Sequence, residues 1–206
     1  MRHLVDIHHG EAWPPVVCAE EPYRYQLSLR WASGAALAAV GLHPSAGAVR
    51  RWDAALWRLS RLAKSWGYAG LTLANLNARI VGCSDDLGAV DDPVGPRNDD
   101  HLRQLANEHD FVLLAWGERA EPVHARRVAA ALWWQLATHG GALGVLGWTP
   151  NGQPCAPARG MTTPLVPISL TAGAHPEFVD VDRHWANLLN AAPSFPVPST
   201  GGVQYA

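Results

Sequence analysis

The stretch "AALAAVGLHPSAG", residues 35–47, decides the fold, because a buried strand ends in it at a tight, glycine-bounded turn. Residues 35–41 are nearly all apolar, which is typical of a strand buried on both faces of a parallel sheet. Pro44 disfavours helical geometry at His43, so the turn separates this strand from the next segment of the chain. Over 49–66, apolar residues recur at steps of three and four, which predicts an amphipathic helix. The stretch therefore predicts a strand followed directly by a helix.

Strand and helix alternate along the rest of the chain. Further buried strands are expected over 69–76, 110–117 and 142–148. Helices are expected over 97–109, 122–140 and 175–190, an edge strand over 165–169, and an outer strand or hairpin arm over 23–31. Crossovers between parallel strands are right-handed, so the helices should cover both faces of the sheet. We therefore expect one α/β domain over 1–190, a three-layer α/β/α sandwich around a mostly parallel sheet of about four to five strands. Residues 191–206 are expected to form a loose tail.

Composition and charge limit the class of protein. Of the 206 residues, 48% are hydrophobic and 17% are charged, so the chain can bury a full core. The apolar runs are shorter than the ~20 residues of a membrane helix, and residues 1–20 lack the apolar centre of a signal peptide. A cytoplasmic, intracellular protein with no membrane partner is expected. The net charge of −2 leaves room only for a local basic patch that could contact nucleic acid.

The sequence offers no pattern typical of a metal or cofactor site. Cys18, Cys83 and Cys155 are scattered, and no pair of His residues has the spacing that puts both on one helix face. The phosphate-binding and dinucleotide-binding glycine motifs are also missing. No metal and no cofactor are therefore expected.

Four loops should carry the function, because ligands of parallel sheets bind outside the carboxyl ends of the strands. These loops span 41–47, 75–99, 116–122 and 147–160. Their motifs occur in the order "GLHPSAG" (41–47), "LTLANLNA" (71–78), "DDPVGPRND" (91–99) and "FVLLAWGERA" (111–120). In this order they resemble the uracil-DNA glycosylase superfamily, and in particular a divergent bacterial branch of glycosylase-like domains. The resemblance runs from about Tyr23 to Arg159 and implies the fold of that superfamily and the excision of a base from DNA.

The chemistry of base excision assigns the catalytic candidates. Hydrolysis of an N-glycosidic bond makes an oxocarbenium-like sugar and an anionic base, so the protein must hold a water and stabilise the departing anion. His43 stands where the superfamily often has Asp or Asn, and an imidazole can accept the proton of water or donate one to the base. Asp92 is the second candidate, for positioning water or sugar. The structural alternatives are a histidine bonded to loop backbone and an aspartate that shapes a turn before proline.

Other residues are expected to read the base. Asn75 resembles the base-reading Asn of the superfamily, because an amide presents a donor and an acceptor together. Ser45 stands where uracil-specific members have a Tyr that crowds carbon 5 of the pyrimidine, so the resemblance implies a base that is bulky at carbon 5. Asn77, Trp116 and Trp148 are further candidates for contacting or stacking on a flipped base. A loop-bridging amide and core tryptophans are their structural alternatives.

Two functions remain open. The first is a monofunctional DNA glycosylase that removes a modified pyrimidine, such as hydroxymethylated or glucosylated cytosine, and leaves an abasic site, as would suit defence against modified phage DNA. Its partner would be DNA, with no obligatory protein partner. Arg79, Arg159 and Met161 are the candidates for contacting the DNA. The structural alternative is that these three residues lie on ordinary surface loops. The second is a non-catalytic or small-molecule relative that binds or hydrolyses free nucleosides or nucleotides. The slight negative charge favours it, as does Ala156, which stands where the last superfamily motif usually has His.

Overall fold

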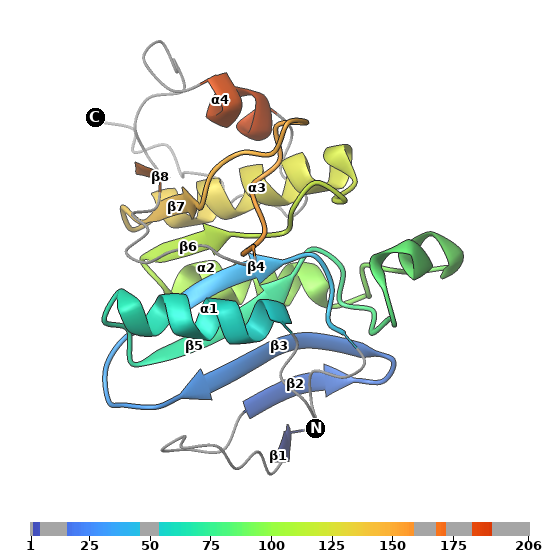
Figure 1. The fold of residues 1–206 in the computed structure, drawn as a ribbon, viewed down its shortest axis with the longest axis horizontal. Coiled ribbons are helices and arrows are strands. Elements are labelled where there is room, and N and C mark those ends of the chain that lie inside the picture. The colour runs from blue at the N-terminus through green and yellow to red at the C-terminus, as the bar shows by residue number, and fades with distance from the viewer. Residues whose placement is uncertain (1, 5–15, 46–53, 159–167, 172–182, 191–206) are drawn as a thin grey trace, which may run out of the picture.

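The computed structural model describes residues 2–4, 16–45, 54–158, 168–171 and 183–190 (Figure 1). The described strands form one sheet in the order β1-β2-β3-β5-β4-β6-β7-β8. The strands are β1 (Arg2–Leu4), β2 (Val16–Glu20), β3 (Tyr23–Arg30), β4 (Ala36–Gly41), β5 (Gly70–Asn75), β6 (Phe111–Leu114), β7 (Ala142–Val145) and β8 (Ile168–Thr171). The helices are α1 (Ala54–Ser65), the short 3-10 helix η1 (Ser84–Ala89), α2 (Asn98–Glu108), α3 (Pro122–Ala137) and α4 (Arg183–Leu189).

The centre of the sheet confirms the four buried strands expected from the sequence. Strands β5, β4, β6 and β7 lie side by side and pair in parallel. Every described residue of β5 is buried, as are all of β4 except its last. A strand covered on both faces needs apolar residues at successive positions, which is the pattern these runs have.

The whole sheet is larger and more mixed than expected. Among the described strands, β3 joins the parallel core through an antiparallel pairing with β5, and β2 and β1 extend that edge. Strand β8 adds an antiparallel edge on the other side. The expectation of a mostly parallel sheet of four to five strands is therefore wrong, because three described pairings are parallel and four are antiparallel. The segment expected as an outer strand or hairpin arm is β3, which forms a hairpin with β2 but lies inside the sheet.

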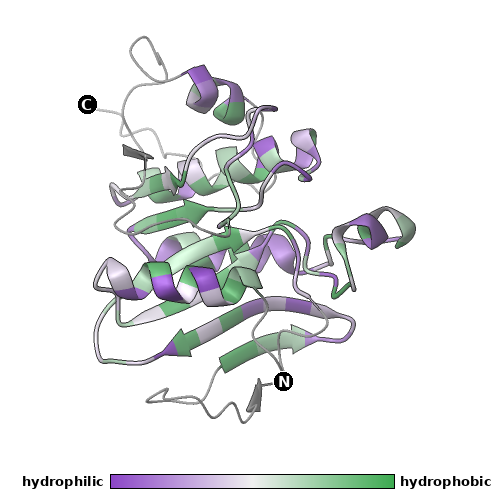
Figure 2. Cartoon of the chain, viewed as in Figure 1, coloured by the Kyte–Doolittle hydropathy of each residue, from purple (hydrophilic) through white to green (hydrophobic). Residues whose placement is uncertain are grey.

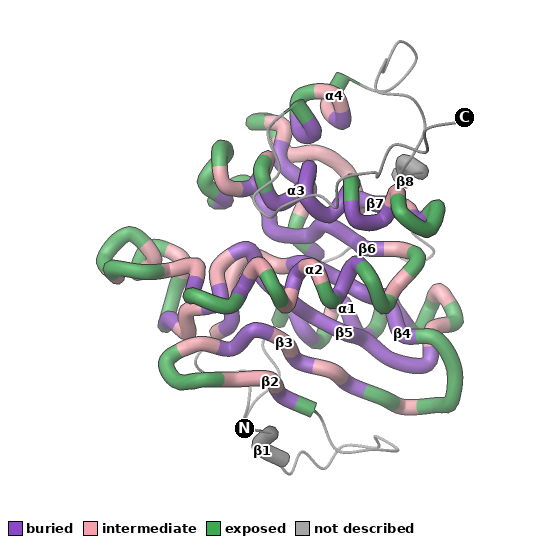
Figure 3. Tube along the Cα trace, turned by 180° about the vertical axis from the view of Figure 1, so that it is seen from behind, coloured by how far each residue is buried: buried purple, intermediate pink, exposed green. Residues whose placement is uncertain are grey.

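Helices cover both faces of the sheet, as expected. Helix α1 packs on one face through Leu56, Leu59 and Leu62, which share a core with β3, β4 and β5. Helices α2, α3 and α4 pack on the other face, where α3 lies between α2 and α4, α2 contacts β5 and β3, and α3 contacts β7. The central strands are apolar, whereas the helices carry both hydrophobic and hydrophilic residues (Figure 2). The same strands are the most buried part of the described chain (Figure 3).

Several expectations fall partly or wholly outside the described residues. These are the start of the first helix at 49–53, the start of the edge strand at 165–167, most of the last helix at 175–182 and the tail at 191–206. Within the described part of the chain, no helix is long and apolar enough to span a bilayer.

Candidate functional site

The four loops expected to carry function meet at the carboxyl edge of the parallel strands. The backbone N–H of Leu76 donates to the carbonyl of Gly41 at 2.9 Å, and that of Ala115 donates to Val40 at 2.8 Å, so the loops after β5 and β6 both fasten to the end of β4. Gly117 donates to Pro154 at 2.9 Å, which ties the last loop to the same edge. The structure therefore brings together loops that lie far apart in the sequence.

Asn75 ends β5 with an amide that the described chain does not use. The residue is only 4% exposed, and no hydrogen bond joins its side chain to another described residue. It pairs in register with Gly41 on β4, and a Cβ at position 41 would lie 2.8 Å from Asn75 Oδ1. A side chain at position 41 would therefore displace this amide. Neither polar atom of this amide is among the fully buried atoms without a partner. The amide is therefore accessible at the edge of the sheet, where a ligand could accept from it and donate to it.

The backbone beneath Asn75 is held by two side chains from other elements. Nδ2 of Asn98 donates to the carbonyl oxygens of Asn75 and Leu76 at 3.1 and 2.9 Å, and Asn98 is completely buried. Nε2 of His124, on α3, lies 3.0 Å from the same Leu76 oxygen. The sequence pattern assigned no such role to Asn98 or His124, because it depends on contacts between distant segments. Asn98 does fall in the "DDPVGPRND" motif, and that is the one signal that could have drawn attention to it.

His43 lies two residues beyond the end of β4, on a turn closed by the chain around Val81. Its Nδ1 lies 3.2 Å from the carbonyl oxygen of Pro44. Because a carbonyl can only accept, this hydrogen bond requires the proton on Nδ1 and leaves Nε2 of the neutral ring as an acceptor. The Pro44 carbonyl also accepts from the backbone N–H of Val81 at 3.4 Å, and Ser45 forms a bridge with Val81. His43 and Ser45 thus lie on a turn whose conformation is fixed from outside.

Asp86, in η1, is a charged group near His43 that the sequence did not single out. The backbone N–H of Cys83 donates to Oδ2 of Asp86 at 2.9 Å and holds the pKa of this carboxyl below its ordinary value. The Cys83 side chain and the charge of His43 act in the same direction. Asp86 therefore stays ionised and its field reaches the His43 ring.

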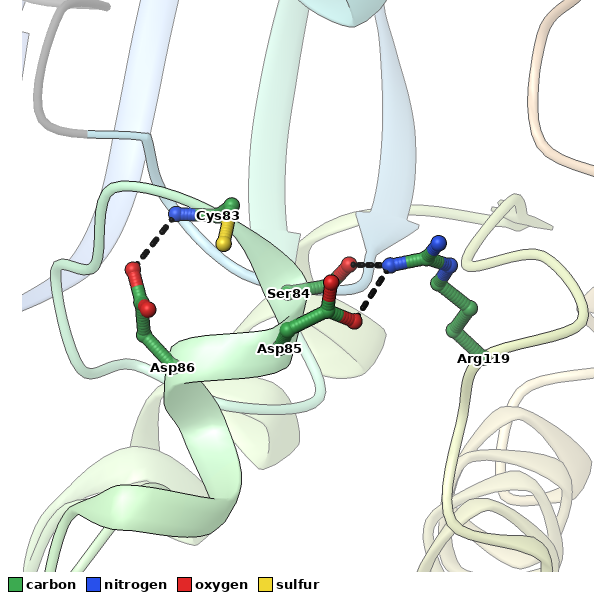
Figure 4. A network of polar contacts seen from close by, with 5 residues as sticks. All are labelled: Cys83, Ser84, Asp85, Asp86 and Arg119. Carbon is green, nitrogen blue, oxygen red and sulfur yellow. Dashed lines mark hydrogen bonds and ion pairs between the residues drawn. The ribbon is translucent and has the colours of Figure 1, made fainter.

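The segment carrying η1 is fastened to the loop after β6. Nη1 of Arg119 donates to Ser84 Oγ at 2.7 Å and to Asp85 Oδ1 at 2.6 Å (Figure 4). Asn151 of the last loop donates to the carbonyl of Glu118 at 2.9 Å. Three of the four loops are joined by these contacts.

Asn77 and Arg79 serve the scaffold in the described structure. Asn77 donates from both its backbone N–H and its Nδ2 to the carbonyl of Leu42, at 3.0 and 3.3 Å. The guanidinium of Arg79 lies 5.6 Å from the ring centre of Tyr23. Both residues fix the loop after β5 against its neighbours.

Asp92 also has a structural partner. Its Oδ1 accepts the backbone N–H of Gly95 at 2.9 Å, and the Tyr23 hydroxyl lies 3.3 Å from its Oδ2. Gly95 has φ 88°, a conformation that favours glycine. No described contact joins Asp92 to His43 or to Asn75, so the turn-forming alternative describes its position here.

Neither candidate tryptophan presents a fully open ring face on which a base could stack. Trp116 is 2% exposed, belongs to the core on the α3 side of the sheet, and donates from Nε1 to Gln153 Oε1 at 2.9 Å. Trp148 is half-buried and stacks on His184 of α4 with ring centres 5.1 Å apart. The face of Trp148 that meets His184 is thus already covered.

The last loop crosses the edge of the sheet toward α1. Nη1 of Arg58 donates to the carbonyl of Pro157 at 2.9 Å, and a Cβ at Gly117 would lie 3.1 Å from Cβ of Ala156. Arg159 and Met161 lie outside the described residues. Among the residues that the structure describes, no group of three or more His, Cys, Asp or Glu side chains is gathered as metal ligands would be.

The fold and this edge define the class: an α/β protein with a parallel core whose candidate functional loops gather at the carboxyl ends of its strands. The chain belongs to the DUF1643 family, because the model of that family, described as a protein of unknown function, matches residues 24–158. The match includes the sheet from β3 to β7 and all four loops up to Ala158. No curated protein and no solved structure matches the chain.

Proposed function

We propose that this protein is a DNA glycosylase of the uracil-DNA glycosylase superfamily, with the corresponding sandwich fold, that removes a 5-substituted pyrimidine from DNA. The observation that carries the proposal is the nearly buried, unpartnered amide of Asn75 beside the His43 turn. The edge of a pyrimidine offers a donor and an acceptor side by side, which an amide matches with two hydrogen bonds. A flipped base would thus satisfy an amide that the described chain leaves unsatisfied.

His43 is the proposed general base. With the proton on Nδ1 directed at Pro44, Nε2 accepts a proton from a water whose oxygen attacks carbon 1′ of the sugar. The bond between carbon 1′ and the base breaks, and the base leaves with the bonding electron pair. The products are an abasic site and the free base.

Ser45 sets the size of the base in this proposal. The side chain is small and its turn is held by the bridge to Val81, so we propose that the base occupies the space that an aromatic ring fills in related enzymes. A substituent at carbon 5, such as a hydroxymethyl group or a sugar, would occupy it. Excision of such bases would suit a cytoplasmic role in defence against modified phage DNA.

The test is release of a base from a panel of DNAs that carry modified pyrimidines, with abasic sites detected by alkaline cleavage. We expect activity on a base enlarged at carbon 5 and a loss of at least about 100-fold in His43→Gln, because general base catalysis contributes 10²–10⁴-fold. His139→Gln is the matched control, since His139 is exposed at the far end of α3. No release from any DNA, or equal rates in both variants, would reject the proposal.

A free nucleoside is the second candidate substrate, favoured by the partners of the arginines near the loops. Arg119 is paired with Asp85, Arg58 is bonded to Pro157, and Arg79 lies on Tyr23. These cations are already engaged, and the net charge is −2. A DNA substrate predicts that activity falls steeply with added salt through counterion release, and a flat response would favour the nucleoside.

A further inference from the structure

A further cavity, of about 290 Å³, lies beside α3, and neither Asn75 nor His43 is among its described lining residues. It is formed by the start of α3, the turn at 151–153 and α4, which lies next to α3 (Figure 1). Its volume is close to the ~300 Å³ at the lower end of small-molecule pockets. The described residues that line it are Pro122, Arg126, Asn151, Gly152, Gln153, His184, Asn187, Leu188 and Asn190.

Gln153 is a nearly buried residue whose side chain offers one unused donor at this cavity. It is 5% exposed, and its Oε1 is taken by Nε1 of Trp116 at 2.9 Å, which fixes the orientation of the amide. Within the part of the chain that the structure describes, Nε2 makes no hydrogen bond. Nε2 is not among the fully buried atoms without a partner, and Gln153 lines the cavity, so this donor is accessible to a ligand there.

Arg126 gives the cavity its charge. Its Nε donates to the carbonyl of Pro122 at 3.2 Å, which directs the guanidinium while leaving both Nη groups without a described partner. None of the described residues that line the cavity carries a carboxylate. Glu121, whose carboxyl senses the charge of Arg126, uses both oxygens to accept the backbone N–H groups of Val123 and His124.

The remaining walls are polar and held in place. His184 stacks on Trp148, and Asn151 is bonded to Glu118. A guanidinium with free Nη groups beside an amide N–H is a donor set for a ligand with several oxygens and negative charge. We propose that this cavity binds the phosphate group of a small molecule or of a DNA strand.

The experiment is calorimetric titration of the full chain with inorganic phosphate and with deoxycytidine 5′-monophosphate. Inorganic phosphate has no base, so its binding is independent of the proposed excision reaction. We expect both probes to bind the wild-type protein, and Arg126→Gln to weaken them roughly tenfold or more, as for loss of a charged hydrogen-bond partner. Arg127→Gln is the matched control, because the neighbouring Arg127 is exposed and does not line the cavity.

A second variant tests the Gln153 donor, and its melting temperature shows whether a loss of binding reflects a loss of structure. Gln153→Glu keeps an oxygen for Trp116 but replaces the free N–H donors with negative charge, so phosphate should no longer bind while the melting temperature changes little. A short single-stranded DNA then distinguishes the phosphate of a DNA strand from that of a small molecule. If the DNA competes with inorganic phosphate, the cavity binds a strand phosphate. If it does not compete, the cavity binds a free phosphate ester. Failure of both probes to bind, binding that survives both substitutions, or an equal loss in Arg127→Gln would overturn the proposal.

Discussion

Replacing Gly41 by Ala should disable base recognition without unfolding the protein. The new Cβ would lie 2.8 Å from Oδ1 of Asn75, against the 3.4 Å at which ordinary contact begins, an overlap of about 0.6 Å. Among the described side chains, the next nearest to that position is Leu73, at an ordinary 3.7 Å. Because no described hydrogen bond holds the Asn75 amide, it should rotate away at a cost of about 1 kcal/mol or less, a fall of roughly 2–4 °C in melting temperature.

The functional loss should be much larger than this loss of stability. Two hydrogen bonds to a base edge contribute about 1–3 kcal/mol of discrimination, so kcat/KM for the preferred base should fall roughly 5- to 150-fold relative to other bases. The assay is base release from paired DNAs that differ only at carbon 5 of the target pyrimidine. Asn75→Ala should lose about as much, and the double variant should lose no more than either one, because both changes remove the same contact.

Gly88→Ala is the control for the added methyl group. Gly88 lies in η1 without a left-handed φ, and a Cβ there would meet no described atom within 4 Å. Its activity and melting temperature should match those of the wild type. The reasoning is refuted if a stable Gly41→Ala protein keeps its rate and its preference among bases, or if Gly88→Ala loses as much.

Three further substitutions test other parts of the structure. Ser45→Tyr should cut release of a base that is bulky at carbon 5 by about tenfold or more, with little change in melting temperature, because the ring would fill the space proposed for the base; full activity on a bulky base would mean that position 45 does not face carbon 5. Asn98→Asp should lower the free energy of unfolding by about 3 kcal/mol or more, because a completely buried carboxylate would face the carbonyl oxygens of Asn75 and Leu76. Denaturant unfolding measures this change, and a change below about 1 kcal/mol would contradict the packing described. Burial raises the pKa of Glu121, but the backbone N–H groups at the start of α3 and the cations nearby lower it to a net value below the ordinary 4.5. Its stabilisation is therefore present above pH 4.5 and lost as pH falls through the lower folded value, so Glu121→Gln should cost about 1 kcal/mol at pH 7 and less at pH 3, by thermal melts at both pH values. A cost that is equal at the two pH values would show that the charge of Glu121 does not matter.

The local pattern of the sequence determined the parallel core and its helices. The apolar runs at 35–41, 69–76, 110–117 and 142–148 each contain one of the strands β4, β5, β6 and β7. Burial on both faces requires apolar residues at consecutive positions, so neighbouring residues are enough to indicate this environment. The same reasoning placed the functional loops at the carboxyl edge, because parallel strands end on one side.

The order of the outer strands in the sheet depends on pairing between distant segments, which no local sequence pattern indicates. Strand β2 has mixed burial, and the position of β3 beside β5 follows from a register between residues forty or more positions apart. Local alternation showed that 23–31 could be a strand but not where in the sheet it lies. Hence the sequence predicted the strand β3 and missed the mixed sheet.

The site divides in the same way. Asn75, His43 and Ser45 could be picked out from the sequence because each lies on a motif at a strand end. Only the tertiary structure showed that the Asn75 amide lies over Gly41 without a partner, that Asn98 holds the backbone beneath it, and that Asp86 lies near His43. Whether a polar side chain is satisfied depends on atoms brought in from distant segments, so residue type and spacing name the candidates, and packing decides which of them is left open to a ligand.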